Sequence, residues 1–370
     1  MRVLIFGKSE SIWVKTVVEH TLLKYGDEVT ILSAGEGDYN PYLDFYKQNN
    51  VTVYPYRKRN GKLGTLLSGF TNLDVLKKKY DLFCVHYVNN RALCVFPIAR
   101  LYSKRSCLFF WGSDLLRDGK RSFLRSYSYK NADHIGISTQ EMLDRFHSLH
   151  GYSYDKKIIR THFGVNGLDP IKDINCDMSI IRHKYNIDPN KVVISIGYNN
   201  IPEQQHIKVL NQIINLPENA RDKIHLLVRM TYGMGSKEYI AEVKDLIIKT
   251  GCSYSVFDSF LSDIEIAELT KLTDIFIHAQ TTDARSASML EHLYANCLVI
   301  NPAWINYADI SDSVFYLTFD AFEDLRKIIT DNLVLKGNNK YLNKLLMNTQ
   351  AVAEFNLWDK LAPTWRDAYN

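Results

Sequence analysis

The sequence predicts an α/β protein of two doubly wound domains, each with a parallel sheet flanked by helices. At 370 residues, 46% of them hydrophobic, the chain is long enough to bury two cores. Short apolar runs alternate with helical patterns, which is typical of βαβ units. This alternation stops near residues 163–185 and then starts again.

The first series predicts a Rossmann-like domain over residues 1–165. Its expected strands are residues 3–7, 28–34, 81–87, 107–112 and 134–139. Its expected helices are residues 13–25, residues 91–103 and the segment that follows residue 139.

The second series predicts a Rossmann-like domain over residues 166–350. Its expected strands are residues 192–198, 225–230, 252–257, 274–280, 297–302 and 313–317. Its expected helices are residues 203–214, 237–250, 261–273 and 287–295. Such sheets bind ligands at the carboxyl ends of their strands, so we expect two facing sheets with a cleft between them.

The end of the chain predicts a helix that packs back on the first domain. Trp358, Leu361, Trp365 and Tyr369 recur at spacings of three and four residues, which places them on one helical face. Pro363 predicts a kink. We assign residues 351–370 to this C-terminal helix.

Positive charge is concentrated in the first half. Residues 1–165 hold 25 Lys and Arg against 15 Asp and Glu, whereas the remainder holds 20 against 26. The surplus gathers at residues 57–62, 77–79 and 117–130, and the last of these runs interleaves basic with apolar and aromatic residues. This pattern favours peripheral contact with an anionic membrane, with a solvated basic face as the alternative. Nucleic acid is a disfavoured partner because no binding motif is present.

We expect a cytoplasmic protein. The opening MRVLIFGKSE leads directly into a strand pattern and lacks the features of a signal peptide. No stretch approaches the roughly 20 apolar residues that span a bilayer. The six cysteines form no CxxC pair, so we expect buried free thiols, no metal and no cofactor.

The segment from Asp283 to Glu291 carries the functional prediction. Ser286, Ala287 and Ser288 precede a predicted helix, and such small residues leave backbone N–H groups open at its N-terminus, which suits a diphosphate. Glu291 lies about one turn further in, where its carboxylate can accept hydrogen bonds from a vicinal diol such as ribose. The alternative is a Ser-capped helix with an exposed acid.

This segment resembles the E-x7-E motif of the large retaining glycosyltransferase family 4, with Asp283 in place of the first Glu. The flanking residues 260–280 and 295–300 extend the similarity. The resemblance implies the GT-B fold, in which two Rossmann-like domains face a central cleft, and sugar transfer from a nucleotide diphosphate sugar. It places Asp283 by the sugar, residues 286–288 at the diphosphate and Glu291 at the ribose.

The first domain resembles the acceptor side of the same family. His86, Gly112 and Asp114 match the residues that line it, and Trp111 stands where the family often has His. Trp111 either stacks on a sugar or belongs to the core. Residues 165–169 resemble the link between the two domains.

A loop after the first strand offers a second candidate for the acceptor side. In GT-B enzymes this loop faces the cleft, so Gly7, Lys8 and Ser9 are candidates for contact with the acceptor or the diphosphate. The alternative is a plain turn between strand and helix. The segment lacks G-x-G-x-x-G, which disfavours nicotinamide binding.

The sequence departs from family 4 in its cations. Where the family has an Arg and a Lys that neutralise the diphosphate, this chain has Tyr198 and Gln204 or Gln205. A leaving diphosphate needs positive charge or a metal, and no metal-binding Asp-x-Asp pair is present. The first candidate for this positive charge is therefore Arg229 and the second is Arg285, together with the helix N-terminus.

Here the sequence is also similar to the 4-acetamido-fucose transferases of enterobacterial common antigen. The similarity rests on Gly197, Asn199, His206, Ile207, Met230, Tyr232, Gly233, Glu238, Tyr239, Ile240 and Val243. It adds Gly197, Tyr198, Asn199 and Tyr232 to the expected donor site.

The expected reaction is metal-independent transfer to a hydroxyl of a lipid-linked or growing surface glycan. A retaining mechanism, which the resemblance favours, would use Asp283 to steady the sugar cation. An inverting one needs a base, and Asp114 and His86 are then the candidates. A GT-B sugar-nucleotide epimerase and a non-catalytic GT-B partner of another transferase are the alternatives.

Overall fold

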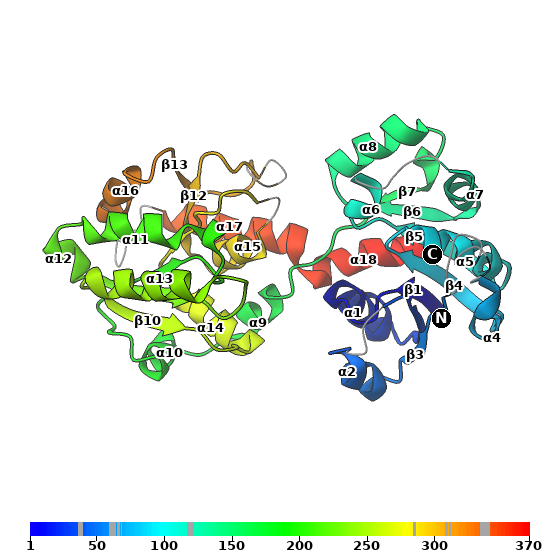
Figure 1. Ribbon diagram of the computed structural model, residues 1–370, viewed down its shortest axis with the longest axis horizontal. Coiled ribbons are helices and arrows are strands. Elements are labelled where there is room, and N and C mark those ends of the chain that lie inside the picture. Colours follow the sequence, from blue (N-terminus) through cyan, green and yellow to red (C-terminus); the bar gives the residue numbers. More distant parts are fainter. Residues whose placement is uncertain are drawn as a thin grey trace. The chain divides into compact units, whose positions relative to one another are not determined.

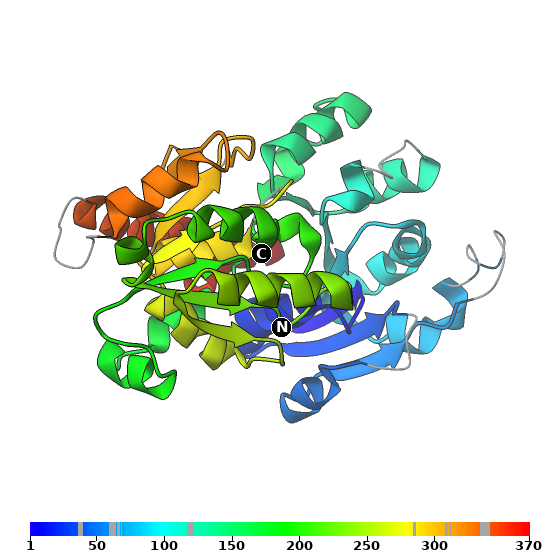
Figure 2. The same cartoon turned by 60° about the vertical axis from the view of Figure 1, so that its left-hand side comes forward.

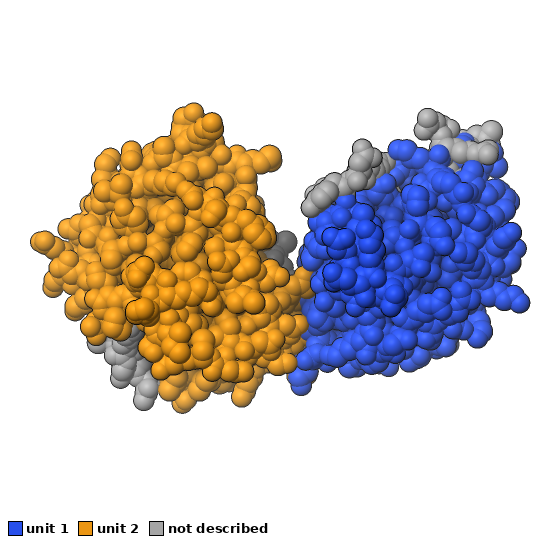
Figure 3. All heavy atoms as spheres, turned by 90° about the horizontal axis from the view of Figure 1, so that it is seen from below, with its two compact units in different colours: residues 1–164, 358–370 blue, residues 165–357 orange. Residues whose placement is uncertain are grey.

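The chain forms two compact units. The computed structural model describes residues 1–35, 40–58, 64, 67, 69–116, 122–283, 286–307, 310, 312–333 and 341–370. Unit 1 comprises residues 1–164 and 358–370, and unit 2 comprises residues 165–357 (Figure 3). In each unit, helices flank a parallel sheet (Figure 1).

Unit 1 contains a seven-stranded sheet in the order β3-β2-β1-β4-β5-β6-β7. Its strands are β1 (Arg2–Gly7), β2 (Glu28–Ser33), β3 (Thr52–Pro55), β4 (Tyr80–His86), β5 (Ser103–Phe109), β6 (His134–Ile137) and β7 (Ile158–Arg160). Its described α-helices are α1 (Ile12–Val17), α2 (Leu43–Gln48), α4 (Leu73–Leu76), α5 (Asn90–Leu101), α6 (Ser113–Leu116), α7 (Phe123–Asn131), α8 (Gln140–His150) and α18 (Trp358–Tyr369).

Unit 2 contains a six-stranded sheet in the order β10-β9-β8-β11-β12-β13. Its strands are β8 (Val192–Ile196), β9 (Ile224–Arg229), β10 (Ser253–Phe257), β11 (Ile275–Ile277), β12 (Leu298–Pro302) and β13 (Leu317–Phe319). Its described α-helices are α9 (Leu168–Asp173), α10 (Met178–Lys184), α11 (His206–Ile214), α12 (Glu218–Arg221), α13 (Lys237–Lys249), α14 (Asp263–Leu272), α15 (Ala287–Tyr294), α16 (Asp324–Asn332) and α17 (Leu342–Asn356).

Both sheets are buried on their two faces, as the near-continuous apolar strands predict. In β1, Leu4 and Phe6 face one core whereas Val3 and Ile5 face another, because successive side chains of a strand point to opposite faces. Unit 2 repeats this arrangement. The helices α11 and α13 lie side by side over one face of its sheet (Figure 2).

The helix α18 completes one core of unit 1. Trp358, Trp365 and Tyr369 are fully buried, and α18 packs against β5, β6 and β7. The Trp365 ring lies 4.7 Å from that of Phe109, and its Nε1 donates to the His162 carbonyl at 2.8 Å. The expected start of this helix at residue 351 lies inside α17, which belongs to unit 2. The chain passes to α18 only at Trp358, because Leu357 is extended.

The strand expected at residues 313–317 is wrong. The backbone N–H and C=O of Phe315 are hydrogen bonded to the Asn348 side chain at 2.6 and 2.7 Å, so Phe315 cannot pair with a strand. Pairing with β12 begins instead at Leu317. The strands β3 and β7, which lie at the two edges of the first sheet, were not predicted.

The helix expected at residues 13–25 is not a single α-helix. After α1 the backbone forms a π turn over Val18–Leu22 and a 3-10 turn over Leu23–Tyr25. Gly26, with φ of +71°, ends this segment, since a left-handed residue terminates a helix.

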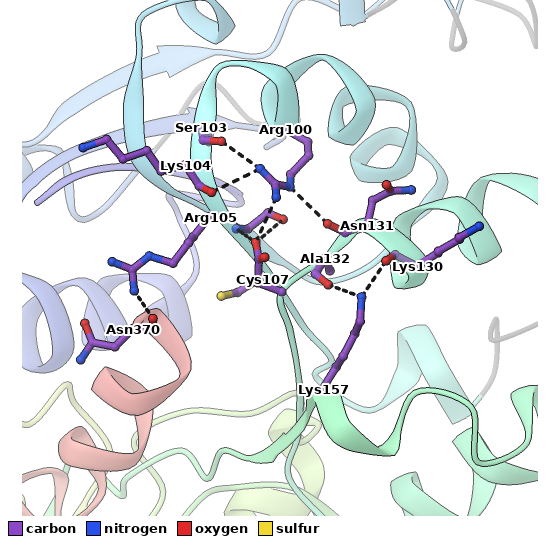
Figure 4. Close-up of polar contacts among 12 residues, drawn as sticks. Arg100, Ser103, Lys104, Arg105, Cys107, Lys130, Asn131, Ala132, Lys157 and Asn370 are labelled. Atoms are coloured by element: carbon purple, nitrogen blue, oxygen red, sulfur yellow. Dashed lines mark hydrogen bonds and ion pairs between the residues drawn. The ribbon is translucent and has the colours of Figure 1, made fainter.

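Part of the positive charge of unit 1 is used internally (Figure 4). The ammonium of Lys157 donates to the carbonyls of Lys130 and Ala132 at 2.6 and 2.7 Å, at the carboxyl end of α7. The guanidinium of Arg100 donates to the carbonyl of Asn131 at 3.2 Å. A cation is favourable at a helix C-terminus, so these two residues hold the end of α7.

The run at residues 117–130 directs most of the apolar and aromatic side chains of its described part into the core. Residues 117–121 lie outside the described part. In α7, Leu124, Tyr127 and Tyr129 pack in the core and Arg125 is buried, whereas Phe123 is exposed. These buried residues of α7 are therefore used in the core, and contact of the segment with a membrane stays a prediction.

No described helix has the length and apolar character that crossing a membrane requires. Among the residues placed by the structure, no cluster of three or more His, Cys, Asp or Glu could hold a metal ion. Five cysteines are buried free thiols, and Cys176 is exposed.

We predict that Trp365→Ala lowers the free energy of unfolding of unit 1 by about 3–5 kcal/mol, since it leaves a cavity beneath α18 and removes the hydrogen bond to the His162 carbonyl. Urea denaturation followed by circular dichroism measures this. The control is Leu101→Ala, at a side chain 81% exposed, which should cost less than about 0.5 kcal/mol. Equal effects of the two changes would contradict the assigned role of α18.

Candidate functional site

A cavity of about 230 Å³ lies in unit 2 where three neighbouring strands end. Its lining residues end β9, follow β8, β9 and β11, or belong to α14 and the first turns of α15. They are Tyr198, Arg229, Thr231, Tyr232, Ile266, Asp283, Ser286, Ala287, Ser288 and Glu291. From β8 the chain adds β9 and β10 on one side of the sheet, and then β11, β12 and β13 on the other. Open α/β sheets bind ligands at such a point, where the strand order reverses.

The amino end of α15 forms one wall of the cavity. Ser286 is its N-cap, and the Ser286 hydroxyl accepts a hydrogen bond from the Met289 N–H at 3.1 Å. The first backbone N–H groups of a helix have no partner within it and carry partial positive charge. Ala287 and Ser288 have side chains small enough for an anion to approach these groups. The three residues predicted for the diphosphate, Ser286, Ala287 and Ser288, therefore lie together in the cavity wall.

Arg229 supplies a buried positive charge beside this helix end. It is the last residue of β9 and is 4% exposed. Its Nη2 donates to the Ser288 hydroxyl at 3.2 Å. Burial lowers the pKa of Arg229, and the neighbouring Glu291 carboxylate acts in the opposite direction. The second candidate cation, Arg285, lies outside the described residues.

Glu291 is half-buried on α15, one turn from the helix start. Burial raises the pKa of Glu291 to about 7, although the Arg229 guanidinium opposes the rise. Its side chain lies against Gly167, since a Cβ built on Gly167 would fall 2.1 Å from Glu291 Oε1. Gly167 has an ordinary φ of −67°, so a larger residue here would disturb the position of the Glu291 side chain and not the backbone conformation.

Asp283 reaches the cavity from the loop after β11, and its side chain is 14% exposed. Asp283 Oδ2 lies 3.5 Å from Nε2 of His278, a residue that is fully buried. Burial raises the pKa of Tyr307, and Asp283 raises it further. Burial likewise raises the pKa of Tyr198, with Asp283 as the next cause. Two tyrosines and a histidine therefore surround this acid.

The four expected residues after β8 and β9 divide into two groups. Tyr198 and Tyr232 line the cavity, and Tyr232 is 57% exposed. Gly197 and Asn199 shape the loop instead. Gly197 has a φ of +60° and a Cβ there would meet His206 Nε2 at 2.6 Å, and Asn199 Oδ1 accepts from the Ile201 N–H at 3.2 Å.

The candidate bases of unit 1, Asp114 and His86, are both buried. Asp114 is 1% exposed and accepts hydrogen bonds from the N–H groups of Val88, Trp111 and Gly112 at 2.7–3.0 Å. Burial raises the pKa of Asp114, and these hydrogen bonds oppose the rise. The carboxylate therefore clamps the loops after β4 and β5. This geometry favours a structural role for Asp114.

His86 lies in an aromatic cage at the end of β4. Its ring stacks on those of Phe109 and Trp365, with centroids 5.0 and 6.0 Å away, and Trp111 meets it edge-on. Burial lowers the pKa of His86 to about 3, so the ring is neutral at physiological pH. Trp111 is half-buried and also contacts Tyr87 and Phe163 edge-on.

The loop after β1 is built around close approaches. A Cβ on Gly7 would lie 3.2 Å from Val14 Cγ2 and 3.3 Å from His86 Cβ. Ser9 is buried and its hydroxyl bonds to that of Ser33 at 2.8 Å, while Lys8 is exposed. Ser9 thus holds the loop, and Lys8 is its accessible cation.

Sequence reasoning missed His278, Gly167 and Tyr307, which lie next to residues that line the cavity. Only His278 gave a usable signal, because a histidine directly after an apolar strand lies at the carboxyl edge of the sheet. The proximity of Gly167 to Glu291 and of Tyr307 to Asp283 depends on tertiary packing between distant segments.

We predict that Glu291 makes the protein less stable as pH rises from about 4.5 to 7. The folded protein keeps a proton in this window that the unfolded chain has lost, so the contribution present at low pH disappears as pH rises. Relative to Glu291→Gln, the wild type should lose on the order of 2 kcal/mol across the window. Urea denaturation at several pH values measures this difference. A difference that stays flat across this window would contradict the prediction.

No protein-family model matches the sequence, and no curated protein matches it. Solved structures do match. A glycosyltransferase from Rickettsia africae is similar at 13% identity and a TM-score of 0.73, over 100% of this chain and 97% of that one. Alr3699/HepE of Anabaena, solved with UDP, is similar at 14% identity and a TM-score of 0.65, over 99% of each chain. Sucrose-phosphate synthase of Thermosynechococcus elongatus is similar at 9% identity and a TM-score of 0.62, over 100% of this chain and 98% of that one. The chain has the GT-B fold.

Proposed function

We propose that the protein is a GT-B glycosyltransferase that moves a sugar from a nucleotide diphosphate sugar to an acceptor hydroxyl. The observation that carries the proposal is one cavity in which the amino end of α15, the Arg229 guanidinium and the Glu291 carboxylate lie together. The donor is a UDP-sugar, because the similar Anabaena protein was solved with UDP.

The diphosphate binds at the amino end of α15. Backbone N–H groups at residues 286–288 donate to its oxygens, and Arg229 lies behind them with its Nη2 on the Ser288 hydroxyl. Preorganised donors of this kind stabilise the negative charge that develops on a leaving group. No metal is required in this scheme, and Arg285 is a further candidate cation.

The ribose binds to Glu291. Above its pKa of about 7 the Glu291 carboxylate is ionised and accepts two hydrogen bonds, which matches the two hydroxyls of a vicinal diol. Glu291 lies one helical turn from the diphosphate site, and no residue in the described part of the chain donates a hydrogen bond to its carboxylate. The exposed ring of Tyr232, at the cavity rim, is suited to stack on the donor.

The reaction proceeds with retention, as in family 4, and Asp283 steadies the positive charge that develops on the sugar. The environments of Asp114 and His86 support this choice over inversion. Asp114 is occupied by three backbone N–H groups, and His86 is enclosed by aromatic rings.

The acceptor is a lipid-linked or growing surface glycan, and the protein acts in the cytoplasm at the membrane surface. The positive surplus of residues 1–165 supports contact with anionic headgroups. A half-buried Trp111 supports a sugar on the acceptor side, because an indole face packs well on a pyranose.

We predict that Arg229→Met and Glu291→Ala each reduce sugar transfer, or donor hydrolysis without acceptor, by roughly 100-fold or more, since each removes a donor or acceptor that the leaving nucleotide needs. Methionine fills the buried Arg229 site with similar volume. Lys244→Met, which removes an exposed charge on α13, is the matched control and should keep its activity.

The same assay separates the alternatives. Near-normal activity in both variants would contradict the site. Conversion of the donor alone to a new nucleotide sugar would indicate an epimerase. Tight binding of UDP-sugars in calorimetry, without turnover on any glycan acceptor, would indicate a non-catalytic partner of another transferase.

We predict that Gly167→Ala weakens UDP binding by about tenfold while the fold survives, because the new methyl displaces the Glu291 side chain from its position. Calorimetry with UDP measures the effect. In a Glu291→Ala background the same change should have no further effect. An equal loss in both backgrounds would show that Gly167 acts by another route.

A further inference from the structure

We infer that His278 is a positioning residue for Asp283. As an imidazolium it forms an ion pair with this acid, and the pair fixes the charge and the direction of the carboxylate that Asp283 presents to the cavity. The inference deepens the proposed function as far as it concerns sugar transfer, and the state of the pair itself is independent of that function.

The first step is the proton on Nδ1 of His278. The Asn301 amide donates through Nδ2 to the carbonyls of Pro302 and Ile305, at 3.0 and 2.9 Å. These two hydrogen bonds fix the orientation of the amide group, with Oδ1 toward His278. An amide oxygen can only accept a hydrogen bond. His278 Nδ1 lies 2.9 Å from that oxygen and therefore carries a hydrogen.

The second step concerns the opposite side of the ring. Because Nδ1 carries a hydrogen, a neutral His278 would direct a lone pair from Nε2 toward Asp283 Oδ2, 3.5 Å away. Two acceptors facing each other in a buried place repel, so a proton belongs to this pair. An imidazole is more basic than a carboxylic acid, which assigns the proton to Nε2. The distance is that of an ion pair.

The third step is the surroundings of the ring. His278 is fully buried between Tyr198, which stacks on it with planes 5° apart, and Phe276. The titratable groups that face it from the described residues are Asp283, Tyr198, Tyr307 and His292. Burial and Arg229 hold the pKa of His292 well below its usual range, so this ring is neutral. Asp283 is thus the group that compensates a charge on His278.

The pair has a consequence for the reaction. A buried carboxylate without a cation tends to take up a proton, and a protonated Asp283 could not steady positive charge on a sugar. His278 keeps Asp283 ionised and orients its carboxylate through the contact between Nε2 and Oδ2. Asp283 also lines the cavity, where its short side chain needs a fixed orientation.

The charge state can be tested in the protein without any substrate. In histidine-selective ¹⁵N NMR at neutral pH, His278 should show hydrogens on both ring nitrogens, with its signal assigned by its loss in His278→Gln. Asp283→Asn should convert the ring to the neutral form with the hydrogen on Nδ1. A wild-type ring with an unprotonated Nε2, or a ring that Asp283→Asn leaves unchanged, would overturn the inference.

The positioning role is tested by kinetics. His278→Gln keeps a hydrogen-bond donor without the charge, and we expect roughly a 10- to 100-fold fall in kcat with little change in the KM for the donor. The acid limb of the pH profile of kcat should move about one unit or more to higher pH, because Asp283 protonates more readily without the cation. His278→Phe keeps only the ring and should lose more.

The matched control is His225→Gln. His225 is a buried histidine of β9 that bonds to Ser253 and Ser255 on the neighbouring strand, away from the cavity. An acid limb that moves equally in both variants, or stays in place in His278→Gln, would overturn the positioning role. If the wild type shows no transfer, the proposed function fails, whereas the NMR result still decides the state of the pair.

Discussion

A guanidinium buried at the end of β9 is the constraint on which the candidate site depends. Removing a cation from water is costly unless polar groups compensate it, and Arg229 is 4% exposed. Ser288 and Glu291 supply that compensation from one helix, α15. The start of α15, its small residues and its acid are therefore coupled: a change in any one alters the cost of keeping Arg229 inside. Arg229 Nε has no hydrogen-bond partner among the described residues, so the compensation by protein groups is incomplete.

Much of this arrangement could be predicted from the sequence. The carboxyl ends of neighbouring parallel strands meet at one edge, so Arg229, which ends a strand, and residues 286–288, which follow the next strand but one along the chain, belong to the same edge. Helix start signals then place Glu291 one turn further in. These steps use only periodicity and topology, which are local properties of the sequence.

The remaining parts depend on packing that no local pattern encodes. Asp114 has the sequence context of a base, but three backbone N–H groups converge on it in the folded chain. Phe315 has the composition of a strand, but Asn348 occupies its backbone groups. In the same way, Gly167 resembles an ordinary loop glycine until Glu291 is seen against it. In each case a side chain from a distant segment decides the role.

Unit 1 is discontinuous in sequence, and this imposes an order on folding during synthesis. The core that α18 completes lacks Trp358, Trp365 and Tyr369 until residues 358–370 leave the ribosome. All of unit 2 is translated before that moment and can fold first, although domains generally fold in order from the N-terminus. Until then residues 1–164 carry an uncovered apolar face that includes Phe109. A nascent chain stalled before residue 358 leaves the ribosome would therefore expose this face to chaperones even though all of unit 2 had been made.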